Sequence, residues 1–191
     1  MFYLKTIQFY EFIRGVTEIV LIYVIPFLNS TEEVVIIKRG CLHMAINYTA
    51  FNEIPNTEIL DGIIKLHTRI FCESDDLAGR LREKPELRID VALDEDKVIG
   101  YKIGYALNRE QFYSWLGGVD AEYRNLGIAS ELMEQQHRFA KESGYKAIQT
   151  KTKNKWRSML ILNIKCGFDI IGTYTDSEGE PKIILEKSLS T

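Results

Sequence analysis

The chain has 191 residues, of which 46% are hydrophobic and 27% are charged. These values are typical of one folded globular domain, and they exclude a disordered chain, a collagen-like repeat and a disulfide-dense scaffold. The formal net charge of −3 gives no bulk electrostatic reason to expect a nucleic acid or an anionic membrane as a partner.

The potential metal ligands are scattered along the chain: Cys41, Cys72, Cys166, His43, His67 and His137. No two cysteines have the close spacing of zinc or redox motifs, so we expect reduced thiols. The histidines form no ligand pattern, and we expect structural roles for them. The sequence therefore predicts no metal cofactor.

Residues 1–43 differ from the rest of the sequence. They hold seven aromatic residues and an apolar run from Ile19 to Leu28. The run is too short to span a bilayer, which takes about 20 apolar residues. Its length fits a secretory signal, but Glu11 and Glu18 lie where a signal keeps positive charge, and no small-x-small cleavage site follows. We therefore predict an atypical N-terminal extension without a membrane partner.

Met44 suggests a second interpretation of this boundary. The Lys-Arg-Gly tripeptide at 38–40 can be encoded by a purine-rich stretch that resembles a bacterial ribosome-binding site, and well-organised patterns begin after Met44. One hypothesis is that the natural chain starts at Met44. The alternative is that residues 1–43 add a strand or helix that packs on the domain. In both cases the domain is expected over residues 44–191.

The sequence of the first half of this domain predicts strands and helices in a mixed order. The predicted elements are a strand at 46–50, a helix at 58–70, a shorter helix at 75–81, and strands at 89–93, 98–106 and 112–119. The acidic turn at 94–96 joins two of these strands into a hairpin. In the strand at 98–106, bulky residues and glycines alternate: Ile99, Tyr101, Ile103 and Tyr105 share one face, while Gly100 and Gly104 lie on the other.

The second half alternates helices with strands. Apolar spacing predicts a helix from near Ile128 to Ser143, with Gly144 at the position of a left-handed C-terminal cap. The remaining predicted elements are a strand at 147–152, a helix at 156–166 capped by Gly167, and closing strands at 168–174 and 182–189.

The segment from Val119 to Ser130 connects a strand directly to an amphipathic helix. The first turn of a helix leaves backbone N–H groups unpaired and carries partial positive charge, so it can hold a phosphate. Gly127 lets the backbone approach an anion, and Arg124 adds a guanidinium that suits phosphate oxygens. A P-loop and a dinucleotide fingerprint are both excluded, because their glycine patterns are absent. Taken alone, the segment also fits a tight turn with a solvated arginine.

The order of elements and two short motifs resemble the GNAT family of N-acyltransferases over residues 44–191. Arg124, Gly127 and Ala129 match the family's Q/R-x-x-G-x-G/A pyrophosphate loop, and Lys165, Gly167 and Phe168 match its K-x-G-F helix end. The resemblance implies a mixed α/β (α+β) fold. In that fold a mostly antiparallel central sheet is flanked by helices, and a splayed parallel strand pair holds the cofactor.

The resemblance also implies a chemistry. It predicts an N-acetyltransferase that moves an acetyl group from acetyl-CoA to a primary amine of a small molecule or protein by direct attack. The pantetheine amides would pair with backbone near Val119, as an added strand does. The implied cofactor-binding residues are Val119, Arg124, Asn125, Leu126, Gly127, Ile128, Ala129 and Ser130. We expect a cytoplasmic enzyme with no nucleic-acid partner, and a homodimer stays open.

Two positions depart from the family pattern. Asn125 stands where the loop usually has glycine, and because Asn tolerates a left-handed backbone better than most residues, anion binding is expected to survive. Asn163 stands where many members have a tyrosine general acid. A carboxamide donates a hydrogen bond to sulfur but delivers no proton at neutral pH. Asn163 is therefore the candidate catalytic residue, as a thioester or thiolate contact, and a local hydrogen bond to backbone is the alternative.

The general base is not identifiable from the sequence. Asp120 and Glu122 lie near the expected reaction site, but residues before such a turn are more often solvated or helix-capping. The basic run of Lys151, Lys153, Lys155 and Arg157 is interpreted as a solvated face, with contact to the cofactor's 3′-phosphate or to an RNA acceptor as alternatives.

Two other functions stay open at this point. The first is a non-catalytic acyl-CoA-binding regulatory protein with the same fold, which Asn163 would permit. The second is an envelope-associated protein tethered through residues 1–43.

Overall fold

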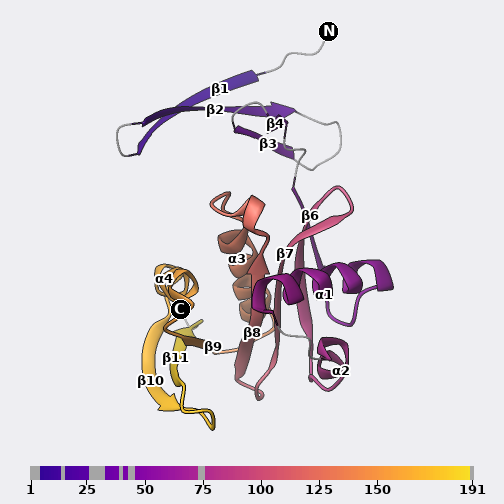
Figure 1. Ribbon diagram of the computed structural model, residues 1–191, viewed down its shortest axis with the longest axis vertical. Coiled ribbons are helices and arrows are strands. Elements are labelled where there is room, and N and C mark those ends of the chain that lie inside the picture. The colour runs from indigo at the N-terminus through magenta and orange to yellow at the C-terminus, as the bar shows by residue number, and fades with distance from the viewer. Residues whose placement is uncertain are drawn as a thin grey trace. The chain divides into compact units, whose positions relative to one another are not determined.

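Figure 1 shows a computed structural model of the chain, which describes residues 5–13, 16–25, 33–38, 41–42, 46–72 and 76–189. The chain divides into two compact units, Met1–Asn47 with Leu93–Lys97, and Tyr48–Ala92 with Val98–Thr191. The hypothetical start at Met44 lies outside the described residues. The boundary between an extension and a domain at residue 44 therefore stays a prediction.

The N-terminal part forms a sheet of four strands in the order β1-β2-β3-β4. Their bounds are β1 (Lys5–Ile13), β2 (Val16–Ile25), β3 (Glu33–Lys38) and β4 (Cys41–Leu42), and each pairs antiparallel with the next. Valine, isoleucine, threonine and tyrosine dominate these segments, and such residues favour strands. The apolar run is a strand as far as Ile25. No helix among the described residues is long and apolar enough to cross a membrane.

The second unit is built on a seven-stranded sheet in the order β10-β11-β9-β8-β7-β6-β5. Its strands are β5 (Asn47–Phe51), β6 (Arg88–Asp94), β7 (Lys97–Ala106), β8 (Gln111–Val119), β9 (Ala147–Lys153), β10 (Asp169–Thr175) and β11 (Pro181–Ser188). Its helices are α1 (Thr57–Phe71), α2 (Leu77–Arg82), a short 3-10 helix η1 (Ala121–Tyr123), α3 (Ile128–Glu142) and α4 (Arg157–Lys165). The predicted mixed fold, with a mostly antiparallel sheet flanked by helices, is confirmed.

Local signals explain where these helices begin and end. Asn56 caps α1, because its side-chain oxygen accepts a hydrogen bond from the Ile59 N–H at 3.1 Å. Gly144 follows α3 with a φ of 85°, and Gly167 follows α4 with a φ of 86°. Both glycines hold the left-handed conformation expected of them, so the predicted ends of these two helices are confirmed.

The alternation along β7 places the helices on opposite faces of the sheet. The Tyr101 side chain lies on the face that α1 covers, because its hydroxyl is 2.6 Å from Nδ1 of His67 in α1. Gly100 lies on the other face, where an added Cβ would come within 3.0 Å of the Ile128 side chain in α3. The predicted separation of bulky residues and glycines is confirmed, and α1 crosses the front of the sheet in Figure 1.

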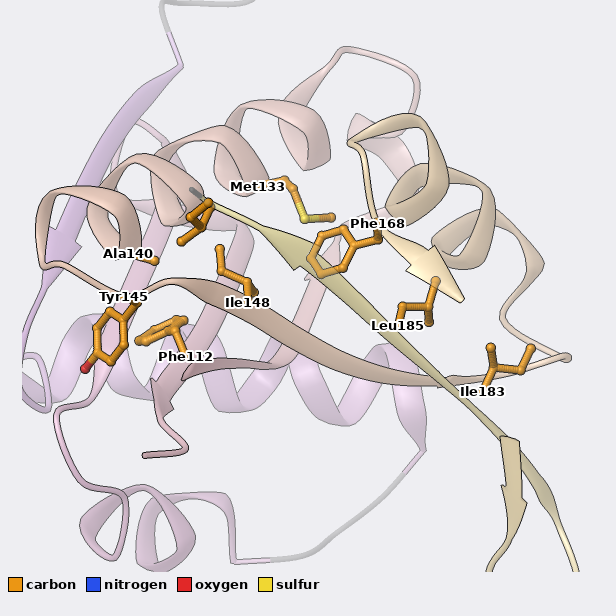
Figure 2. Packing of buried hydrophobic residues seen from close by; sticks show 9 residues of the cluster. Phe112, Met133, Ala140, Tyr145, Ile148, Phe168, Ile183 and Leu185 are labelled. Carbon is orange, nitrogen blue, oxygen red and sulfur yellow. The ribbon is translucent and has the colours of Figure 1, made fainter. Parts of the chain in front are cut away.

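A core cluster fills the α3 side of the sheet. Figure 2 shows residues of this cluster, in which the rings of Phe112 and Tyr145 lie 5.3 Å apart. The cluster consists of Phe112, Met133, Ala140, Tyr145, Ile148, Phe168, Ile183, Leu185 and Leu189. Met159, Leu160 and Leu162 of α4 pack against the same cluster as Met133 of α3. Helices α3 and α4 therefore share one face of the sheet, on both sides of the junction between β8 and β9.

Candidate functional site

Strands β8 and β9 separate after a short parallel contact. They pair only from Gln111↔Ala147 to Tyr113↔Gln149. The last link between them is the hydroxyl of Thr150, which donates to the carbonyl of Ser114 at 2.8 Å. Beyond Ser114, β8 pairs with β7 on one side, while the edge toward β9 has no ladder partner among the described residues. The predicted splayed parallel pair is confirmed.

A β-bulge in β8 accounts for this separation. The β7–β8 register runs from Ile103↔Leu116 to Gly104↔Ser114, so Trp115 is an extra residue. A bulge bends its strand and increases the local twist. Because the bulge lies at the point where β8–β9 pairing stops, it turns β8 away from its parallel neighbour.

The end of β8 leads through η1 into the loop at 124–127. Asn125 has a φ of 65° and Gly127 a φ of 83°, so both are left-handed. The expectation that Asn125 takes this conformation is confirmed. Gly127 is the N-cap of α3 and offers no side-chain cap, so no side chain at that position covers the first-turn N–H groups. A Cβ on Gly127 would meet nothing within 4 Å, which means that the backbone there is open to a ligand.

The predicted cofactor-binding residues follow one another around this loop with different exposures. Arg124, Asn125, Gly127 and Ser130 are exposed, while Val119, Leu126 and Ala129 are half-buried. Ile128 is buried against β7, so its side chain anchors the helix start. The Arg124 Nε donates to the Val119 carbonyl at 3.4 Å, which directs the guanidinium toward the end of β8.

Asp120 has a structural explanation. The residue is 3% exposed, and one side-chain oxygen accepts a hydrogen bond from the Glu122 N–H at 3.1 Å. The other oxygen binds Nη1 of Arg69 at 2.8 Å. Capping of η1 and an ion pair with α1 thus occupy the carboxylate, as the helix-capping interpretation expects.

Asn163 is 3% exposed in the interior, on α4. Its carbonyl accepts the Phe168 N–H at 3.1 Å, and the Ile164 carbonyl accepts the Gly167 N–H at 3.0 Å. This pair of bonds around a left-handed glycine is a Schellman motif, and Phe168 enters the core directly after it. The K-x-G-F pattern is therefore a helix-end signal that fixes the last turn of α4, on which Asn163 lies.

The basic run on β9 and the start of α4 is largely engaged in surface contacts. Lys153 and Lys155 both pair with Glu180, and the Lys151 ammonium lies 5.3 Å from the ring centre of Tyr174. Asp176, Glu178 and Glu180 are the one group of potential metal ligands in the described part of the chain. Asp176 and Glu180 already bind turn N–H groups or lysines.

A group of buried charged and polar residues lies on the α3 side of the sheet, and sequence reasoning did not single it out. We call it the buried polar cluster: Asp90 of β6, Lys102 of β7, and Gln136 and His137 of α3 are buried, and half-buried Lys187 of β11 borders them. The Arg88 Nε donates to one Asp90 oxygen at 2.8 Å. Lys187 donates to His137 Nδ1 at 3.1 Å and to the Cys166 carbonyl at 2.7 Å.

Several polar atoms of this cluster have no partner among the described residues. They are Oδ2 of Asp90, Nε2 of His137, and both Nε2 and Oε1 of Gln136. Buried polar atoms left unpaired cost roughly 1–3 kcal/mol each, so they are rare in folded proteins. A set of them on one face of the sheet marks a region that is not built for stability alone.

Burial also shifts the pKa values of the cluster. Desolvation lowers the pKa of Lys102 to about 8, although the charges of Asp90 and Cys166 oppose the change. Desolvation, and then the charges of Lys187 and Lys102, lower the pKa of His137 to about 3. Because Lys187 can only donate, Nδ1 of the neutral His137 accepts and Nε2 carries the proton. Desolvation raises the pKa of Asp90, while its bond to Arg88 opposes the change.

Comparison with known proteins found a matching family model and many similar solved structures. The family model described as the acetyltransferase (GNAT) family matches residues 57–168. Comparison with the curated proteins found no match.

Solved structures of acetyltransferases share the fold. An aminoglycoside 6′-acetyltransferase type Ii has a TM-score of 0.65 at 19% identity, over 75% of this chain and 98% of that chain. The ribosomal-protein-S18-alanine N-acetyltransferase from Escherichia coli has a TM-score of 0.63 at 14% identity, over 76% and 96%. A GNAT family acetyltransferase from Elizabethkingia anophelis with acetyl-CoA bound has a TM-score of 0.58 at 18% identity, over 75% and 97%.

Proposed function

The chain belongs to the acetyltransferase (GNAT) family and is an acyltransferase, and we propose that it transfers the acetyl group of acetyl-CoA to a primary amine by direct attack. The acceptor is a small molecule or a protein amino group. Solved structures with this fold include an enzyme named for aminoglycosides and one named for a ribosomal protein, so the fold serves both acceptor classes.

One observation carries the proposal: the unpaired edge of β8 leads, through η1 and the loop at 124–127, to the open N-terminus of α3. An extended ligand with amide groups can pair with such an edge as an added strand. A pyrophosphate at the end of that ligand would meet the first-turn N–H groups of α3. Coenzyme A has both parts in this order. One family member of the same fold is known with acetyl-CoA bound.

The loop residues would divide the work of binding. The backbone of Val119 pairs with the pantetheine, and the N–H groups from Leu126 to Ser130 face the pyrophosphate. Arg124 adds a charge-assisted contact. Asn125 and Gly127 supply the left-handed turns that orient these N–H groups. Half-buried Ala129 leaves room beside the phosphates.

The reaction needs a positioned neutral amine and a stabilised leaving group. The amine nitrogen forms a bond to the thioester carbonyl carbon as the C–S bond breaks, and the electron pair of that bond stays on sulfur. The nitrogen loses one proton and the sulfur gains one, so the products are an amide and free CoA. Asn163, buried on α4, would orient the thioester through its carboxamide.

A thiol-release assay with a panel of amines tests this function. The panel should contain small polyamines, an aminoglycoside and peptides with free N-termini. We expect acetyl-CoA-dependent release of free thiol with at least one amine, and loss of that release in Arg124→Glu. A protein that binds acetyl-CoA tightly but accelerates no transfer would instead be the non-catalytic regulator.

Exposed apolar residues of α4 and β10 support a homodimer as part of the proposal. Ile161, Ile164, Ile170 and Ile171 are about half exposed, and β10 is the edge strand of the seven-stranded sheet. Its free edge can pair antiparallel with the same strand of a second copy. Sedimentation velocity of the full chain and of Ile171→Lys measures this directly.

The domain boundary and the cytoplasmic location are proposals of the same kind. A chain that begins at Met44 and binds acetyl-CoA as tightly as the full chain would support the boundary. Cell fractionation tests the location.

A further inference from the structure

Lys102 lies beside the splayed part of β8. In the β7–β8 ladder it is the partner of Gly117, three residues beyond Ser114, where contact with β9 ends. A Cβ on Gly117 would lie 3.6 Å from Cγ of Lys102. Because Gly117 has no side chain, the aliphatic stem of Lys102 can pack against the backbone of β8. The stem is on the face that α3 and α4 share, because Gly100 on the same face of β7 meets α3.

Charged and titratable groups from four elements interact with this lysine or with its neighbours. They are Asp90 of β6, His137 of α3, Cys166 at the end of α4, and Lys187 of β11, which adjoins both His137 and Cys166. The Lys102 ammonium interacts electrostatically with Cys166 at the end of α4 and with His137 of α3, and both of these helices pack on this face of the sheet.

Lys102 is not explained as a structural ion pair. Its side chain is only 7% exposed, yet it has no hydrogen bond or salt bridge among the described residues. The carboxylate of Asp90, whose charge acts on Lys102, accepts from Arg88 through one oxygen, and its other oxygen has no partner among the described residues. A lysine buried in this way costs stability, since its charge is desolvated without a matching bond. Contact with a bound ligand would explain why a buried lysine is present despite its cost in stability.

The proposed acetyl transfer leaves such a role open, because Asn163 cannot donate a proton to the leaving sulfur. Resting on the proposed function, we infer that the Lys102 ammonium lies against the sulfur of bound CoA and supplies the proton that the leaving thiolate takes up. When the C–S bond breaks, its electron pair stays on sulfur and forms a bond to a proton from Nζ of Lys102. The neutral lysine then regains a proton from solvent, which has received the one lost by the amine.

The acidity of Lys102 suits this step. Its pKa of about 8 lies below the ordinary value near 10.5, so proton loss is much easier than for a surface lysine. That value is close to the pKa of an ordinary thiol, roughly 8.5. Transfer between groups of similar pKa is nearly balanced in free energy, and the ammonium is still the main form at neutral pH.

The contact with sulfur is tested without any acceptor amine. Proton release on binding of CoA is measured by calorimetry in buffers of different ionisation enthalpy, from pH 6 to 9, and compared with desulfo-CoA, which lacks the thiol. We expect the wild type to lower the thiol pKa of bound CoA by about 1 unit or more, as an adjacent positive charge does. Lys102→Met should abolish the difference between the two ligands, and Lys102→Arg should retain it. Lys141→Met, which removes an exposed lysine in the last turn of α3, is the control and should match the wild type.

Proton delivery is tested by the single-turnover rate of transfer to an amine found in the panel. Lys102→Met and Lys102→Arg should both slow transfer at least tenfold, because arginine keeps the charge but does not give up a proton. The wild-type rate should fall above about pH 8, and this fall should vanish in both variants. Unfolding curves show whether Lys102→Met folds. If it does not, the rate and pH profile of Lys102→Arg decide whether Lys102 delivers the proton.

The outcomes separate the two proposals. If neither CoA nor desulfo-CoA binds, the proposed function fails. If both bind and Lys102→Met leaves the thiol pKa unchanged, the inference about Lys102 is wrong while the proposed function stands. If Lys102→Arg transfers the acetyl group as fast as the wild type, the ammonium acts by charge alone and the proposed proton delivery is wrong.

Discussion

The loop after β8 and the buried polar cluster differ in how the chain builds them. The loop at 124–127 and the first turn of α3 form one continuous stretch, residues 124–130, in which all residues except Ile128 are exposed or half-buried. The cluster takes its side chains from β6, β7, α3 and β11, and all of them except half-buried Lys187 are buried. A change in the loop should therefore alter ligand binding and leave stability alone, whereas a change in the cluster should alter stability and its dependence on pH.

The largest expected effect is on the loop. Arg124→Glu replaces a charge-assisted phosphate contact by repulsion, which should weaken acetyl-CoA binding by about 4 kcal/mol while the free energy of unfolding stays within about 0.5 kcal/mol. Calorimetry and urea unfolding measure the two quantities. Arg109→Glu makes the same charge change in the turn before β8, at the other end of the strand, and should leave the affinity intact. Equal affinity in Arg124→Glu and the wild type would remove Arg124 from the binding site.

The second effect is a loss of stability at low pH that arises from the buried polar cluster. Because the pKa of folded His137 is about 3 and that of an unfolded histidine is roughly 6.5, the unfolded chain binds more protons between these values. The free energy of unfolding should therefore fall as the pH is lowered from 6.5, by about 3 kcal/mol at pH 4 from this residue.

His137→Asn keeps an acceptor for Lys187 and should remove this part of the acid dependence. Urea unfolding of both proteins between pH 4 and 7 gives the difference, in which the carboxylates common to both cancel. Parallel curves for the two proteins would contradict the shifted pKa.

A smaller effect of opposite sign is expected at Gln136. Both polar atoms of its amide are buried and have no partner in the part of the chain that the structure describes. Gln136→Met keeps the shape and removes the unpaired groups, so it should raise the free energy of unfolding by about 1–2 kcal/mol. Gln135→Met is the matched control at the preceding residue, whose amide donates to Glu131 at 2.9 Å. It should change the free energy of unfolding by less than about 0.5 kcal/mol. A loss of stability in Gln136→Met would show that the amide is paired in solution.

Asn163 should matter modestly for the rate. One neutral hydrogen bond contributes about 0.5–1.5 kcal/mol, so Asn163→Ala should slow single-turnover transfer by no more than about tenfold and leave acetyl-CoA affinity nearly unchanged. Stopped-flow detection of the released thiol measures the rate. A loss beyond about a thousandfold would assign Asn163 a larger role than orientation of the thioester.

The smallest effect is expected at Asn125. Its φ of 65° suits glycine, so Asn125→Gly should change both stability and acetyl-CoA affinity by less than about 0.5 kcal/mol. Asn125→Val should weaken acetyl-CoA binding by about 1–2 kcal/mol, because a β-branched residue resists the left-handed conformation of this turn. If valine is tolerated as well as glycine, the left-handed turn is not needed for binding.

These two regions also explain how far the sequence could be interpreted. Periodicity and caps are local, so α1 and α3 lie within one or two residues of their predicted bounds, and Gly144 and Gly167 take the expected conformations. The anion loop was visible for the same reason. Its key residues follow one another in the chain.

The cluster gave no such signal, because it depends on tertiary contacts. Lys102 lies between Gly100 and Gly104 on the glycine face of β7. The alternation of bulky residues and glycines did not predict whether a lysine on this face is buried. Its place beside Gly117 follows from a register that the bulge at Trp115 shifts. The partner of Asp120 is Arg69 of α1, which is 51 residues away in the chain. Residues 1–43 left strand and helix open, because no sequence pattern in them decided between the two.

Hydrogen–deuterium exchange with and without acetyl-CoA tests the central claim most directly, namely that the ligand occupies the edge of β8 and the loop after it. Saturating acetyl-CoA should slow amide exchange in peptides that cover residues 114–130, and the slowing should disappear in Arg124→Glu at the same ligand concentration. Acetyl-CoA that binds by calorimetry but leaves exchange in these peptides unchanged, or slows it only elsewhere in the chain, would contradict the account.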